Sequence, residues 1–191
     1  MSGRDKPVLP EDIRPVTQMV LDFWHSIRSE NIAPHRSDLR PAAIVSILPN
    51  LMILESKGSA TLNVRLAGTA VLECIGREIT GANLYDFLEP YLCEKAKNMV
   101  DLVRSHPCGM LIHAHMKSRY HAPSVAEIIM LPMRSRDGEI SQMIGSLSSS
   151  ASFEIPNFID NRTFPAHFSP QFIDLGVGTP QACLDISRQA V

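Results

Sequence analysis

Two long apolar runs that lie close together in the chain constrain the fold more than any other feature of this sequence. Residues 125–133 and 140–148 carry most of the Ile, Leu and Met of this region, and the short segment 134–139 separates them. That segment contains Asp137-Gly138, a pair that supplies the backbone conformations of a hairpin turn. The pattern therefore predicts an antiparallel β-hairpin and commits this part of the chain to a sheet.

Three earlier segments also predict strands, at residues 51–55, 61–67 and 108–117. In the last two, apolar residues alternate with polar ones, as in a strand with one buried face. The apolar residues of this pattern are Leu62, Val64 and Leu66 in one segment and Met110, Ile112 and Ala114 in the other. Two strands, several helices and three further strands predict an α+β fold, with an antiparallel sheet and helices on one face.

Helical spacing is clearest near the N-terminus, where Pro15 suits the first turn and Val16, Val20 and Trp24 recur at intervals of four. We expect an amphipathic helix that ends near residues 31–34, a short helix at 41–48 and a longer one at 92–105. After residue 150 the chain contains four prolines, which interrupt regular structure, and five of the seven phenylalanines. We expect this segment to be extended and docked. The predicted organisation is a leader with helix at 1–40, a domain at 41–150 and an extension at 151–191.

The charge and hydropathy of the chain exclude several classes of function. The formal net charge is −2, from 18 basic and 20 acidic residues, so no broad positive surface exists to bind nucleic acid. The sequence contains no run of about 20 apolar residues for a membrane span and no apolar signal region at its start. Its four cysteines are far apart, which favours reduced thiols. We expect a cytoplasmic protein.

One glycine-punctuated segment carries a resemblance to a known family. Gly76, Gly81, Leu84 and Asp86 resemble the Gly-x4-Gly-x2-Leu-x-Asp segment of PAS domains. Further positions resemble a family of short bacterial proteins built on one PAS domain, and these are Trp24, Arg28, Pro34, Arg36, Asp38, Pro41, Leu48-Pro49, Arg65 to Thr69, Gly76-Arg77 and, more weakly, Asp174 to Gly176. The resemblance implies a PAS fold with a five-stranded antiparallel sheet, often dimeric, that serves in sensing or protein contact.

The resemblance does not extend to the cofactor motifs of better-known PAS subclasses. Cys93 lacks the surrounding asparagine, arginine and glutamine of the flavin-photoadduct motif. The helix predicted at 92–105 has no internal histidine to ligate haem, because His106 comes only at its end. We therefore predict no cofactor and disfavour both flavin and haem.

Candidate binding residues follow from the apolar faces of the predicted strands. If the core contains a cavity, its ligand-binding residues should be Leu62, Val64, Leu66, Met110, Ile112, Ala114 and Met143. The same residues would make a fully packed core equally well. The apolar side of the N-terminal helix is the candidate homodimer interface, with Met19, Phe23, Trp24 and Ile27. The alternative is that this helix folds back on its own sheet, and both arrangements can occur together.

Two histidines on one strand face, His113 and His115, could begin a metal site, but no nearby residue completes it, so we predict no metal and a polar outer face. The function predicted is a stand-alone PAS sensor or adaptor that is not an enzyme. It would relay a signal by binding an unidentified partner protein, a small molecule, or both. The alternatives are a small α+β enzyme with a cone-like cavity that uses Glu127 with His113 or His115, and a purely structural interaction protein.

Overall fold

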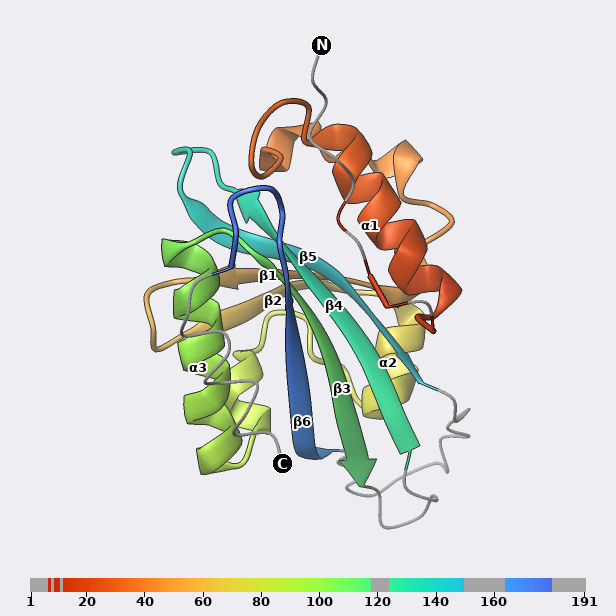
Figure 1. Ribbon diagram of the computed structural model, residues 1–191. Helices are drawn as coiled ribbons and strands as arrows, with labels where there is room; N and C mark the ends of the chain where they lie inside the picture. The colour runs from red at the N-terminus through yellow and green to blue at the C-terminus, as the bar shows by residue number, and fades with distance from the viewer. Residues whose placement is uncertain (1–6, 8, 11, 118–123, 150–163, 180–191) are drawn as a thin grey trace.

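A computed structural model describes residues 7, 9–10, 12–117, 124–149 and 164–179 of the chain. Six strands form one antiparallel sheet in the order β2-β1-β5-β4-β3-β6 (Figure 1). The strands are β1 (Leu51–Ser56), β2 (Leu62–Ala67), β3 (Gly109–Lys117), β4 (Ser124–Arg134), β5 (Ile140–Ser149) and β6 (Phe164–Ile173). The α-helices are α1 (Pro15–Ile27), α2 (Thr69–Ile75) and α3 (Pro90–Ser105), and 3-10 helices cover η1 (Arg36–Asp38), η2 (Pro41–Ala43), η3 (Leu48–Asn50) and η4 (Leu84–Phe87).

The PAS-type α+β architecture predicted from the sequence is confirmed, with one difference in the number of strands. All five expected strands are present, and β6 adds a sixth from the segment after residue 150. We expected Pro165 and Pro170 to prevent regular structure there. They are tolerated because β6 pairs only with β3 and lies at the edge of the sheet, where half of its backbone groups need no ladder partner.

The short helix expected at residues 41–48 is also different in the structure. Two separate 3-10 turns, η2 and η3, occupy this region, and only a turn connects them. Ile44 and Ile47 are buried, whereas Val45 and Ser46 are exposed. Pro49 falls inside η3, and the chain enters β1 directly after it.

The predicted hairpin between residues 125 and 148 is confirmed as β4 and β5, which pair from Ala126↔Ser149 to Arg134↔Ile140. Gly138 adopts a positive φ of 88° at its turn. The Asp137 carboxylate accepts hydrogen bonds from the Ser135 hydroxyl at 2.5 Å and from the Glu139 N–H at 3.2 Å. The turn is therefore fixed by its own side chains.

The sheet separates two hydrophobic cores, with α1 on one side and α3 on the other (Figure 1). The first core lies under α2, η4 and α3 and contains Val71, Tyr85 and Met99. The second lies under α1 and includes Val20 and Trp24, both fully buried. The side of α1 that carries Thr17, Val20, Leu21 and Trp24 thus faces its own sheet. No helix in the described part of the chain is both long and apolar enough to cross a membrane.

A β-bulge changes which face of the sheet the end of β2 presents. The register shifts between Ile53 and Leu54, which pair with Leu66 and Val64, so Arg65 is the extra residue. Leu66 therefore packs with Ile53 in the core under α1, while Val64 lies in the other core. The expectation that Leu62, Val64 and Leu66 share one face is corrected for Leu66, because strict alternation fails across a bulge.

Candidate ligand-binding cavity

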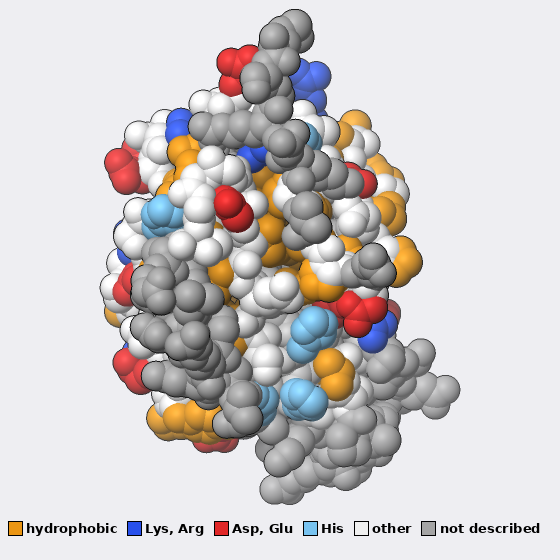
Figure 2. Space-filling view, in the orientation of Figure 1, with side chains coloured by type: hydrophobic (Ala, Val, Ile, Leu, Met, Phe, Trp, Pro, Cys, Tyr) orange, Lys and Arg blue, Asp and Glu red, His pale blue; other side chains and the backbone are white. Residues whose placement is uncertain are grey.

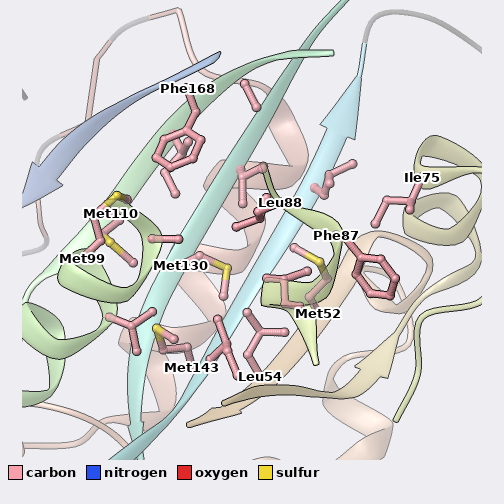
Figure 3. A pocket seen from close by; sticks show the side chains of 18 residues that line it. Met52, Leu54, Ile75, Phe87, Leu88, Met99, Met110, Met130, Met143 and Phe168 are labelled. Atoms are coloured by element: carbon pink, nitrogen blue, oxygen red, sulfur yellow. The ribbon is translucent and has the colours of Figure 1, made fainter. Parts of the chain in front are cut away.

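A cavity of about 150 Å³ lies between the sheet and the helices of the first core. Figure 3 shows the side chains that point into it, with Phe168 and Phe87 at opposite sides. The lining residues are Met52, Leu54, Leu62, Ile75, Leu84, Phe87, Leu88, Ala96, Met99, Val100, Met110, Ile112, Ala114, Ile128, Met130, Met143, Leu147 and Phe168. A cavity of this size in an apolar core can hold a molecule such as benzene.

The chemistry of the lining is uniform. Every described residue that lines the cavity has an apolar side chain, so none offers a side-chain nitrogen or oxygen to a ligand. Five of the eighteen are methionines, whose flexible thioethers adapt to ligand shape. A polar or charged ligand would lose its hydrogen bonds to water here without replacing them. The cavity therefore favours a compact, uncharged and apolar molecule.

Five of the seven residues expected to bind a ligand line this cavity, namely Leu62, Met110, Ile112, Ala114 and Met143. Val64 is buried in the same core without lining the cavity, and Leu66 lies on the other face of the sheet. The five residues come from β2, β3 and β5 of the same sheet, and they lie on the face of the sheet that α3 covers. Whether they bind a ligand stays a prediction.

Strand alternation alone missed the lining residues that come from helices. Ala96, Met99 and Val100 line the cavity from α3, and their i, i+3, i+4 spacing is visible in the sequence. Phe87 lies at the end of η4, and no periodic pattern marks it. Phe168 comes from β6, a strand that the prolines concealed. Helix spacing could have found the first group, but only the tertiary fold reveals the last two.

One wall of the cavity depends on a glycine. If residue 145, on β5, carried a Cβ atom in place of the Gly145 hydrogen, that atom would lie 1.9 Å from the Ile129 carbonyl oxygen and 2.5 Å from the Met130 sulfur. No side chain fits at those distances. Gly145 therefore lets Met130, which lines the cavity, pack directly over the β5 backbone.

The Cys74 thiol lies in the same core as the cavity and is not activated. Burial raises the pKa of the Cys74 thiol to about 11, which keeps it protonated at neutral pH.

Lys95, on α3, is positioned next to β6, where its Nζ donates a hydrogen bond to the Phe168 carbonyl oxygen at 3.2 Å. Burial lowers the pKa of Lys95 because the charged ammonium is partly removed from water.

Glu127 lies on the opposite face of the sheet from the cavity, beside the start of α1. Its Oε1 accepts hydrogen bonds from the Arg14 N–H at 3.0 Å and from the Thr17 hydroxyl. Arg14 is the N-cap residue and Thr17 lies in the first turn of α1, so a carboxylate from β4 caps the helix and lies at the positive end of its dipole. His113 Nε2 lies 3.7 Å from Glu127 Oε2. The pair proposed for an enzyme therefore does not reach the cavity.

Histidines gather on this same polar face, where Figure 2 shows them toward the lower end of the sheet. His115 of β3 and His167 of β6 are cross-strand partners with ring centroids 6.0 Å apart. Among the residues that the structure describes, no group of three or more His, Cys, Asp or Glu side chains could hold a metal ion.

The four residues expected at a dimer interface divide between the inside and the outside of the chain. Trp24 is fully buried, and its indole N–H donates to the Pro132 carbonyl oxygen at 2.8 Å. Met19 is 43% exposed, and Phe23 and Ile27 are half-buried. Trp24 therefore belongs to the packing of α1 on its own sheet, while the other three form a stripe that solvent reaches.

The comparison with family models agrees with this architecture. The family model described as PAS domain matches residues 13–148. No curated protein shows a significant match. Among solved structures, a light-oxygen-voltage domain studied with a flavin analogue is similar at 13% identity and a TM-score of 0.42, covering 60% of this chain and 86% of that chain. The light state of the blue-light photoreceptor Aureochrome1 LOV is similar at 16% identity and a TM-score of 0.35, covering 59% and 90%.

Proposed function

The chain belongs to the PAS domain family, a family of sensor and signalling modules, and on that premise we propose that it senses a small apolar molecule. The ligand occupies the methionine-rich cavity, and the signal leaves through contact with another protein chain. The observation that carries the proposal is the cavity itself, about 150 Å³ in volume and lined by apolar side chains. Its lining selects against charge and hydrogen-bonding groups.

The chemistry of the lining argues against a flavin or a haem. The isoalloxazine ring has a polar edge that needs hydrogen-bond partners, and none of the described lining side chains supplies one. Haem iron in proteins is held by His, Cys or Tyr, with Met serving as a second ligand beside His, and no His, Cys or Tyr lines the cavity in the described part of the chain. Both groups are also far larger than a molecule of benzene, which fills a cavity of this size.

Titration with benzene, followed by calorimetry and by NMR shifts of the methionine methyl groups, tests this function. We expect the purified protein to bind benzene and not to bind flavin mononucleotide. Ala96→Leu places a larger side chain in the cavity from α3 and should abolish benzene binding. Ala43→Leu makes the same change at an exposed site in η2 and should leave binding intact. Equal binding by both variants would contradict the proposed site.

For the output, we propose contact between two copies of the chain through the outer side of α1. Figure 2 shows hydrophobic side chains along the edge of the molecule beside α1. Met19, Phe23 and Ile27 recur at intervals of four and so form one stripe on this helix. Light scattering of the wild type and of Met19→Glu tests the proposal. A mass near the monomer value of 21.1 kDa for the wild type at micromolar concentration would contradict it.

We propose no catalytic role for the cavity. An acid or base in it would have to come from a titratable side chain, and no described lining residue carries one. Glu127 and His113 lie on the other face, where the carboxylate holds α1. Substitution Glu127→Gln should therefore loosen α1 without altering benzene affinity. A metabolite turned over by the wild type and not by this variant would favour the enzyme alternative.

A further inference from the structure

β6 occupies an unusual place, because it lies outside the region that matches the family and yet contributes to both cores. It pairs along its length with β3, from Gly109↔Ile173 to Lys117↔Phe164. Phe168 lines the cavity, whereas Ile173 packs in the core under α1. A single edge strand therefore connects the two faces of the sheet.

The cavity side of β6 is held by α3. The Phe168 ring is 5% exposed, and the Lys95 ammonium lies 5.2 Å from its centroid. The Lys95 Nζ also donates to the Phe168 carbonyl oxygen at 3.2 Å. Because Ala96 of the same helix lines the cavity, Phe168 and α3 enclose the ligand space from adjoining sides.

The other end of β6 is held by the C-terminal end of α1. Directly after the strand, the Leu175 carbonyl oxygen accepts a hydrogen bond from Arg28 Nη1 at 2.9 Å. Arg28 is 1% exposed, and its guanidinium lies 5.3 Å from the Trp24 ring centroid. The Asp174 carboxylate accepts hydrogen bonds from the N–H groups of the next turn, including Gly176 at 2.7 Å. Leu175 is thus fixed against the helix.

We propose that β6 is the element that transmits occupancy of the cavity to α1, because a ligand in contact with Phe168 holds β6 on the sheet and thereby holds Leu175 against Arg28. This proposal rests on the proposed function, since it assumes a ligand in the cavity. The physical reason is differential affinity: a ligand that packs against the Phe168 ring binds the docked state of β6 better than a state in which the strand has left. The ligand then shifts the population toward the state in which α1 is anchored.

Hydrogen exchange of the backbone amides, with benzene as the probe, tests the coupling. If the open state does not bind benzene, opening of β6 should fall about tenfold at a benzene concentration of about ten times its Kd. The last turn of α1 should be protected together with β6, and it is read at Arg28, whose N–H donates to the Trp24 carbonyl oxygen at 3.2 Å. Binding of benzene with unchanged exchange in β6 would overturn the proposal.

Two matched variants distinguish the effect of ligand contact with Phe168 on β6 from the effect of a larger cavity. Phe168→Ala and Phe87→Ala both enlarge the cavity, the first from β6 and the second from η4. Benzene should still protect β6 in Phe87→Ala and should lose most of this effect in Phe168→Ala. Arg28→Lys should keep the protection of β6 and lose that of the last turn of α1. Equal protection of β6 in Phe168→Ala and Phe87→Ala would overturn the proposal.

Exchange without ligand distinguishes failure of this proposal from failure of the proposed function. If benzene does not bind the wild type, the sensing function fails. The coupling is then decided by the ligand-free proteins. In these, Phe168→Ala should speed exchange in the last turn of α1, on the far side of the sheet, and Phe87→Ala should not. The same exchange rate in both variants would overturn the coupling.

Discussion

Replacement of Trp24 by alanine should be among the most destabilising single changes in this chain. The side chain is fully buried between α1 and the sheet, and its indole N–H reaches the Pro132 carbonyl oxygen at 2.8 Å. Pro132 lies two residues beyond the last β4 residue that pairs with β3, Met130, so the sheet supplies no strand partner on that side. The indole therefore satisfies a carbonyl group that would otherwise be unpaired.

The size of the effect follows from these contacts. Truncation of a buried Trp to Ala removes about 3–5 kcal/mol through lost burial and the cavity left behind. Trp24→Phe keeps most of the burial and removes the hydrogen bond, which should cost about 1–3 kcal/mol for the buried carbonyl. Since small domains are stable by only about 5–15 kcal/mol, Trp24→Ala removes a large share of the total.

Urea unfolding followed by circular dichroism measures the effect, because Trp24 is the only tryptophan and fluorescence is lost with it. Ser26→Ala is the matched control, since Ser26 is an exposed residue of the same helix. We expect the order Trp24→Ala, Trp24→Phe and Ser26→Ala, from the least to the most stable. A loss in Trp24→Ala no larger than in Ser26→Ala would refute the assignment of α1 to its own sheet.

Three further experiments test other parts of the structure. Gly145→Ala should destabilise the protein by about 1–3 kcal/mol in urea unfolding, because its Cβ would overlap the Ile129 carbonyl oxygen; wild-type stability would refute the close approach of these strands. The Cys74 thiol, whose pKa is raised to about 11 by burial, should resist iodoacetamide at pH 8 until urea unfolds the protein, and rapid alkylation of the native state would contradict this. Hydrogen bonds from backbone N–H groups, of which the one from Gly176 has the largest effect, lower the pKa of Asp174. The ionised carboxylate therefore contributes fully to the stability of the protein at neutral pH, and this contribution is lost as the pH falls below about 4. Asp174→Asn should therefore reduce the loss of stability in acid, and an unchanged pH profile would argue against the turn.

Much of the sheet could be predicted from local sequence patterns, because those patterns depend on neighbouring residues only. The hairpin of β4 and β5 follows from two apolar runs and Gly138, and the period of two in β3 separates Met110 from His113 without knowledge of the fold. The amphipathic spacing of α1 likewise identified Val20 and Trp24 on its buried side, although it missed Thr17 and Leu21. These features require no information on long-range partners.

Other features depend on pairing between distant segments, which a local pattern does not contain. The bulge at Arg65 moves Leu66 to the other face, and it is defined by the register with β1. Pro165 and Pro170 seemed to exclude a strand, although an edge position beside β3 tolerates them. Sequence reasoning also left open whether the N-terminal helix packs on its own sheet or on another chain. The structure places Trp24 against its own sheet.

Residue spacing along the chain was enough to identify the family, the alternation of most strands and the amphipathic helix. The presence of a cavity in the core required the three-dimensional arrangement. The same apolar residues can pack fully or leave a space, and the outcome depends on how α3, η4 and β6 meet over the sheet. The capping of α1 by Glu127 and the contribution of Phe168 to the cavity wall also required it, since both join residues far apart in the chain.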